Sequence, residues 1–130
     1  MRLLSNLLCH DIDLCCHFFQ QLLQLEEITA SRSPIYRALS VGHEGELGFN
    51  APAARALLHL EADGPPASGT RCFATFMLDT PQQVDAAASQ AQALGGGLIK
   101  APFETYYGQW QTVLSSPEGH AFRVGSLLQG

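Results

Sequence analysis

The sequence predicts an α+β fold of two tandem modules, each with the order strand, helix and three strands (βαβββ). Two observations predict it. Residues 71–127 show the pattern of a strand, a helix and three further strands, and the first fifty residues show a fainter copy of the same order. Two such modules are expected to form a curved mixed-sheet half-barrel around a shared cleft. We expect the functional site to lie in that cleft.

Length and composition fit one globular domain. The chain has 130 residues, of which 46% are hydrophobic and 15% charged, and this composition argues against disorder. The formal charge is −5, and the seven Lys and Arg residues are scattered, which excludes a nucleic-acid-binding stripe. The apolar stretch at residues 3–9 contains Ser5 and Asn6 and is too short and polar for a signal peptide or membrane span. We therefore predict a cytoplasmic protein with no membrane partner.

The cysteines raise the question of a zinc site, because Cys9, His10, Cys15, Cys16 and His17 lie close together in the sequence. Adjacent residues on a helix point about 100° apart, so Cys15 and Cys16 cannot easily face one ion. No spacing typical of a disulfide framework is present. We expect buried free thiols rather than a metal centre.

The first module is expected in about residues 1–52. A strand at 3–8 is followed by a helix that Asp11 or Asp13 can cap. On this helix, four apolar residues fall on one stripe: Leu14, Phe18, Leu22 and Leu25. Three short strands are predicted next, at residues 27–34, 36–41 and 46–49. Gly42-His43-Glu44-Gly45 separates the last two strands and is typical of a hairpin turn.

Residues 53–69 are expected to link the modules. Pro52 can start a short helix over residues 53–60, and the Gly- and Pro-rich residues 62–69 are the most linker-like part of the chain.

The second module, in residues 70–130, has clearer signals. A strand at 72–78 precedes a helix with Thr80 as N-cap, Pro81 at the first position and Gln83 as capping-box partner. The helix is amphipathic, and three glycines at 95–97 end it. The remaining predicted strands cover residues 98–102, 109–114 and 121–124.

Several motifs in this order resemble the vicinal oxygen chelate superfamily, the group of glyoxalases, bleomycin resistance proteins and extradiol dioxygenases. The motifs that carry the resemblance are Asp11 with Phe18-Phe19 and Leu22-Leu23, Val84-Asp85-Ala86-Ala87, Ala93-Leu94-Gly95-Gly96, Tyr107-Gly108, and Pro117-Glu118-Gly119-His120. The resemblance covers nearly the whole chain. It implies a pair of βαβββ modules around a cavity. In metal-dependent members, four side chains hold a divalent cation there, one from the first and one from the last strand of each module.

The resemblance places these four ligand positions on residues that are mostly unsuited to a metal. Glu46-Leu47-Gly48-Phe49-Asn50 resembles the glyoxalase segment Glu-Leu-Thr-Tyr-Asn, so Glu46 matches a ligand. By the same resemblance, the first-strand histidine position falls at about Leu4, the opening-strand position of the second module at about Phe73, and the closing-strand Glu position on Arg123. A shift of one residue would offer Ser5 or Asn6, Cys72, and Phe122 or Val124. We therefore predict no metal-ligating residue and no cofactor; a divalent metal stays possible, although three of the four positions are lost.

The pocket is expected to have aromatic walls, because Tyr106, Tyr107 and Trp110 border the cavity in this fold and Tyr36 and Phe49 come from the other module. The alternative is that these rings fill the core. A pair of Arg123 with Glu46 across the cleft is one hypothesis, and its role is left open between structural and ligand-facing. The candidate catalytic residue is Glu46. The candidate ligand-binding residues are Asn6, Tyr36, Arg37, Phe49, Phe73, Thr75, Tyr107, Trp110 and Arg123.

Three functions compete on these observations. The first is a metal-independent protein of the bleomycin-resistance type that binds a small aromatic or cationic molecule in the inter-module cleft. The second is a glyoxalase-type lyase or isomerase with Glu46 as base or metal ligand. The third is a role in assembly without a small ligand. In each case we expect a homodimer, because module pairs expose sheet edges.

Overall fold

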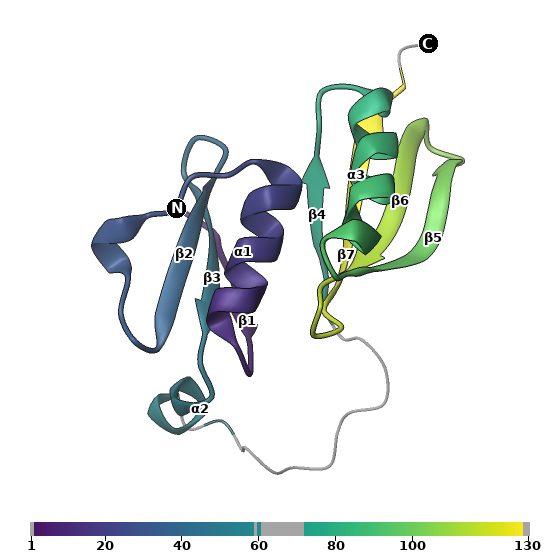
Figure 1. Ribbon diagram of the computed structural model, residues 1–130. Helices are drawn as coiled ribbons and strands as arrows, with labels where there is room; N and C mark the ends of the chain where they lie inside the picture. The colour runs from purple at the N-terminus through teal and green to yellow at the C-terminus, as the bar shows by residue number, and fades with distance from the viewer. Residues whose placement is uncertain (1, 59, 61–71, 129–130) are drawn as a thin grey trace. The chain divides into compact units, whose positions relative to one another are not determined.

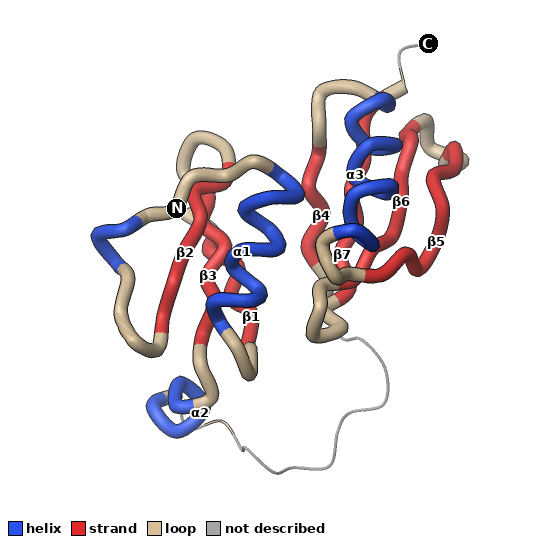
Figure 2. The backbone as a smooth tube through the Cα atoms, viewed as in Figure 1, coloured by secondary structure: helices blue, strands red, loops and turns tan. Residues whose placement is uncertain are grey.

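The computed structural model describes residues 2–58, 60 and 72–128. The chain forms two compact units, Met1–Gly69 and Thr70–Gly130, each with its own mixed sheet. The predicted α+β class is therefore confirmed (Figures 1 and 2). Within the described part of the chain, no helix is long and apolar enough to cross a membrane.

The first unit contains a three-stranded sheet in the order β1-β3-β2, on which one long helix packs. Its elements are β1 (Leu4–Leu8), α1 (Ile12–Leu23), the 3₁₀ helix η1 (Thr29–Ser31), β2 (Tyr36–Val41), β3 (Gly45–Asn50) and the short α2 (Ala53–Leu57). Strand β3 pairs in parallel with β1 and antiparallel with β2.

Helix α1 starts where the sequence predicts, because the Asp11 side chain accepts hydrogen bonds from the backbone N–H groups of Asp13 and Leu14. Phe18 and Phe19 are buried, and Phe19 packs against Phe49 of β3 with ring centroids 5.7 Å apart. The predicted apolar stripe is wrong at one end: Leu14 is 46% exposed, and Cys15 and Ile12 take its place in the core. The buried face shares Phe18 and Leu22 with the expected one and extends toward Cys15 and Phe19.

The predicted strand at residues 27–34 is wrong. Glu27 forms an isolated bridge with Leu39, and Ser33 forms one with Tyr36, but η1 interrupts the segment between them. The turn is fixed locally, since the Ser31 hydroxyl donates to the carbonyl of Ile28 at 3.1 Å. Short polar side chains that bond to the nearby backbone compete with the hydrogen bonds of a sheet. This segment therefore adds no strand, and the first sheet has three strands.

The second unit contains a four-stranded sheet in the order β4-β7-β6-β5, covered on one face by a helix. Its elements are β4 (Ala74–Met77), α3 (Pro81–Ala93), β5 (Gly97–Glu104), β6 (Gln109–Ser115) and β7 (Ala121–Leu127). The capping box is confirmed: Gln83 N–H donates to the Thr80 hydroxyl, and the Gln83 side chain accepts from the Thr80 N–H.

The internal repeat is visible in the topology of both sheets. In each unit the first strand pairs in parallel with the last one, β1 with β3 and β4 with β7. A helix connects the first strand of each unit to the strands that follow. The short helix predicted within residues 53–60 is present as α2, whereas residues 62–69, predicted as the linker, lie outside the described residues.

Candidate functional site

Each sheet has a face that packs on its helix and a second face, which we call the helix-free face. In the second unit, Phe122 and Val124 of β7 are buried, and they lie opposite Leu114 and Thr112 of β6. Trp110, which has the same parity as these β6 residues, donates from Nε1 to Asp85 of α3 at 2.7 Å. This set marks the helix face. Because strand side chains alternate, Arg123 and Val113 belong to the helix-free face.

Arg123 lies at the centre of a cluster on the helix-free face of the second unit. Its Nε donates to the Thr75 hydroxyl at 3.0 Å, and its Nη1 donates to the Tyr107 hydroxyl at 3.3 Å. The guanidinium carbon lies 5.0 Å from the ring centroid of Phe73. The register of β4 and β7 places Thr75 directly opposite Arg123. The structure thus brings together four of the predicted ligand-binding residues.

Beside this cluster lies a hollow of about 370 Å³. Its lining residues are Phe73, Ile99, Val113, Ala121, Phe122 and Arg123. The walls are therefore apolar except for one guanidinium. Within the described ranges, Arg123 forms no ion pair, since the four salt bridges found there involve Arg2, Arg32 and Arg37.

Four of these lining residues were not among the candidates predicted from the sequence: Ile99, Val113, Ala121 and Phe122. The signal for two of them was present, because Val113 and Ala121 have the parity of Arg123 in the predicted strands. Ile99 could not be found this way, since the pairing of β5 with β6 shifts register between Leu98 and Lys100. Alternation fails at such irregularities.

In the first unit, Glu46 occupies the corresponding place on the helix-free face. It lies on β3 opposite Leu4 of β1, and its Oε1 accepts from Nη2 of Arg2 at 2.9 Å. The Glu46 side chain is 22% exposed and that of Arg2 is 50% exposed. An ion pair between Glu46 and Arg123, which would join the two units, stays a prediction.

Asn6 and Tyr36 lie on the same face of the first sheet, above Gly48. A Cβ atom at Gly48 would be 2.6 Å from Oδ1 of Asn6 and 2.6 Å from the Tyr36 hydroxyl. Asn50 donates to the Asn6 side chain at 3.1 Å. Burial raises the pKa of the Tyr36 hydroxyl, and the negative charge of Glu46 adds to this effect. Glycine at position 48 makes this close approach of side chains possible.

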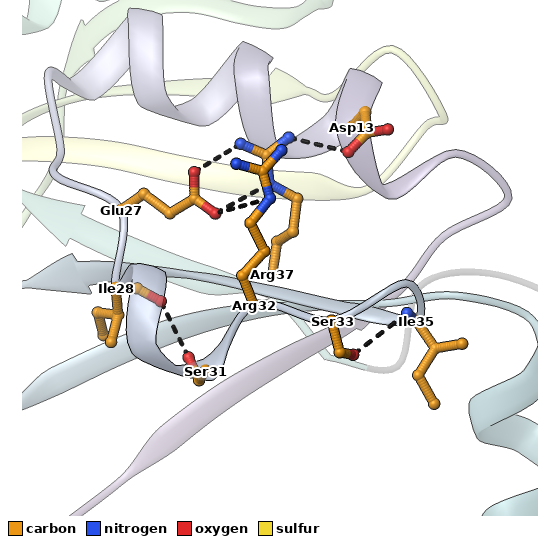
Figure 3. A network of polar contacts seen from close by, with 8 residues as sticks. All are labelled: Asp13, Glu27, Ile28, Ser31, Arg32, Ser33, Ile35 and Arg37. Atoms are coloured by element: carbon orange, nitrogen blue, oxygen red, sulfur yellow. Dashed lines mark hydrogen bonds and ion pairs between the residues drawn. The ribbon is translucent and has the colours of Figure 1, made fainter.

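Three predicted ligand-binding residues lie on the helix faces instead: Arg37, Phe49 and Trp110. Phe49 is fully buried against Phe19, and Trp110 is bonded to α3. Arg37 is held by two carboxylates, with Nη2 at 2.6 Å from Oε1 of Glu27 and Nη1 at 2.9 Å from Oδ1 of Asp13 (Figure 3). Phe49 therefore fills the core of its unit, and Trp110 and Arg37 make their contacts with the helix or loop of their own unit.

The network around Arg37 is electrostatically matched. The hydrogen bonds from Arg37 hold the pKa of the Glu27 carboxyl below its ordinary value, and in turn they raise the pKa of Arg37. Arg32 lies 3.7 Å from the same carboxylate (Figure 3). Burial raises the pKa of the neighbouring Cys16 thiol. These contacts join α1, the segment before η1 and β2, and they give Arg37 a structural role.

The donor set does not fit the divalent metal that the resemblance implies. In the first unit the two facing positions are Leu4 and Glu46, and in the second unit Arg123 faces Thr75 and contacts Phe73. Aliphatic and aromatic side chains donate no ligand atom, and a guanidinium stays protonated. Among the described residues, no three His, Cys, Asp or Glu side chains form a group that could hold a metal ion. The four cysteines, all of them among the described residues, form no disulfide.

Comparison with known proteins identifies a family. The family model described as Glyoxalase/Bleomycin resistance protein/Dioxygenase superfamily matches residues 5–124. A solved structure described as a glyoxalase/bleomycin resistance protein/dioxygenase family enzyme from Burkholderia phytofirmans PsJN is 40% identical, with a TM-score of 0.88 over 96% of this chain and 97% of that one. The search of curated proteins found no match.

Two more distant structures show the fold alone. A glyoxalase-related enzyme from Fulvimarina pelagi has a TM-score of 0.81 at 13% identity, covering 97% of this chain and 87% of that one. A lactoylglutathione lyase from Agrobacterium tumefaciens has a TM-score of 0.69 at 19% identity, covering 97% and 92%.

Proposed function

Because the chain belongs to the glyoxalase/bleomycin resistance protein/dioxygenase superfamily, we propose that it binds a small molecule with an aromatic or apolar body and needs no divalent metal to do so. The observation that carries the proposal is the hollow beside Arg123 in the second unit. It has apolar walls and presents the Arg123 guanidinium where the resemblance places a carboxylate ligand.

The size and lining of the hollow support small-molecule binding. Ligand sites typically have volumes of about 300–1,000 Å³ and apolar walls with a few placed polar groups. The hollow, at about 370 Å³, falls within this range. A guanidinium at a metal-ligand position would repel a divalent cation and could not coordinate it. The same residue therefore supports ligand binding and argues against the usual metal site.

A fragment screen with a blocking variant tests the proposal. Ligand-observed NMR over small aromatic compounds should show saturable binding to the wild type. Ala121→Leu adds bulk at the lining of the hollow and should weaken binding, whereas Ala86→Leu, at an exposed position on α3, should not. Absence of binding across the screen, or equal effects of both variants, would contradict the proposal.

The alternative is a glyoxalase-type lyase or isomerase that uses Glu46 as base or metal ligand. It is favoured by the position of Glu46 on the helix-free face, near enough to Tyr36 to raise the pKa of its hydroxyl. If the protein binds its ligand without a metal, the affinity for the screened ligands should be the same in EDTA and in added Ni²⁺, Zn²⁺, Fe²⁺, Mn²⁺ or Co²⁺. Metal-dependent turnover that Glu46→Gln abolishes would instead establish the alternative.

Two further expectations belong to this proposal. The protein is proposed to work in the cytoplasm, a location that the exposed free thiol of Cys72 supports. It is also proposed to form a homodimer, because among the described residues β1 and β4 lie at the edges of their sheets, and a sheet edge favours association.

A further inference from the structure

We infer that the ligand carries a negatively charged group, such as a carboxylate, on an aromatic or apolar body, and that Arg123 binds this group. The inference rests on the proposed function, because it specifies the chemistry of the same hollow. The resemblance places a carboxylate metal ligand at position 123, whereas this chain has a guanidinium there, so the charge at this position is inverted. A positive charge at position 123 suits an anion and not a cation.

The hydrogen bonds of Arg123 leave part of its guanidinium available. A guanidinium has five N–H donors, and the two bonds to Thr75 and Tyr107 engage Nε and Nη1. No carboxylate pairs with Arg123 within the described ranges. The planar fork of arginine matches a carboxylate, to which it can donate two parallel hydrogen bonds.

Both groups that hold Arg123 in place are neutral. The Thr75 and Tyr107 hydroxyls accept hydrogen bonds and so orient the guanidinium, but they leave its charge uncompensated. Arg37 shows the opposite arrangement, because two carboxylates, Glu27 and Asp13, neutralise it. Both guanidinium groups are protonated, but only the charge of Arg37 is compensated by carboxylates. Arg123 is oriented by hydrogen bonds and its charge is not compensated, which is the state that an anion-binding residue requires.

The walls of the hollow define the rest of the ligand. Ile99, Val113 and Ala121 offer apolar surface, and the Phe73 ring lies next to the guanidinium. An ammonium ligand would meet a like charge at short range. The overall charge of −5 opposes anions only at long range, where about 8–10 Å of salt solution already screens it. The contact with Arg123 therefore determines the sign of the preferred charge. It favours aromatic anions, whereas the sequence predicted an aromatic or a cationic ligand.

Three matched probes test the sign of the charge: 2-naphthoate, 2-naphthamide and 2-naphthylmethylamine, titrated by calorimetry at neutral pH and about 0.1 M salt. Wild-type protein should bind the carboxylate at least about tenfold more tightly than the amide, as expected for a charge-assisted pair that is partly exposed. Arg123→Gln should remove this preference, and Arg123→Lys should keep only part of it. Lys100→Gln removes one positive charge from the same sheet outside the hollow and should leave the preference intact.

The outcomes separate this inference from the proposed function. Equal affinity for the carboxylate and the amide, or a carboxylate preference that survives in folded Arg123→Gln, would overturn the inference and leave small-molecule binding intact. Absence of binding by any compound in the aromatic screen would overturn both. Folding of each variant is checked by its ¹H–¹⁵N spectrum, so that a loss of affinity is not confused with a loss of structure.

Discussion

The ion-pair network of the first unit predicts a large loss of stability when Glu27 is replaced by glutamine. Glu27 makes two hydrogen bonds to Arg37, of 2.6 and 3.1 Å, and their side chains are only 9% and 12% exposed. Removal of one partner of a buried pair costs about 3–5 kcal/mol, because the other charge stays buried. In the variant, Asp13 still neutralises part of the Arg37 charge, which reduces this cost. The reduction is incomplete because the Asp13 side chain is 75% exposed. We therefore expect Glu27→Gln to lower the free energy of unfolding by about 2 kcal/mol.

The same contact predicts how stability depends on pH. The pKa of Glu27 is lowered in the folded state, so its ionised form stabilises the protein fully above the ordinary value of 4.5. That contribution is lost as the pH falls below 4.5 and through the folded-state pKa. The difference in stability between wild type and Glu27→Gln should therefore be greatest near neutral pH and shrink in acid.

Urea denaturation followed by far-UV circular dichroism measures this effect. Tryptophan fluorescence would be a poor probe, since the single Trp110 belongs to the second unit. Glu26→Gln is the matched control, because Glu26 is an exposed carboxylate one residue away and should cost less than about 0.5 kcal/mol. If Glu27→Gln is no more destabilising than Glu26→Gln, or if the difference grows in acid, the reasoning is refuted.

Three other predictions concern thiols, a glycine and association. Cys72 should react with a thiol reagent in the native protein, and the other three cysteines only after denaturation, because they are buried. Rapid reaction of all four thiols in the native protein would contradict this prediction. Gly48→Ala should destabilise by about 1–3 kcal/mol, since its Cβ would lie 2.6 Å from two side-chain atoms, and Gly125→Ala should cost less with its nearest contact at 3.2 Å; equal costs would count against it. Sedimentation at micromolar concentration should show a dimer, and a monomer would refute the edge-strand argument.

The parts of the fold that the sequence predicts well have local causes. The N-cap at Asp11 and the capping box of Thr80 and Gln83 are made by neighbouring residues, and both helices begin where these residues indicate. The strand predicted at residues 27–34 fails because β propensity does not show whether a partner strand or a local turn will satisfy the backbone.

The candidate site was predictable only in part, because a residue's face in a sheet depends on register. Phe73, Thr75 and Tyr107 all contact Arg123, and the four residues were among the candidates named from the sequence, whose role in ligand binding stays a prediction. The contacts of Trp110 could not be predicted from the sequence for a different reason. An aromatic residue with a polar tip suits a pocket wall or a helix contact equally well, and its hydrogen-bond partner Asp85 lies 25 residues away in the sequence.

The two repeats differ in their charged residues but share the surrounding geometry. Gly48 and Gly125 lie two residues after Glu46 and Arg123 on the last strand of each unit, and side chains of both flanking strands crowd each glycine. In each unit, the charged residue faces the first strand from the helix-free side. Because a sheet tolerates either charge at a partly exposed position, topology does not determine which ion the position attracts. The chemistry of the second unit depends on the side chain of Arg123 and on the neutral hydroxyls that hold it.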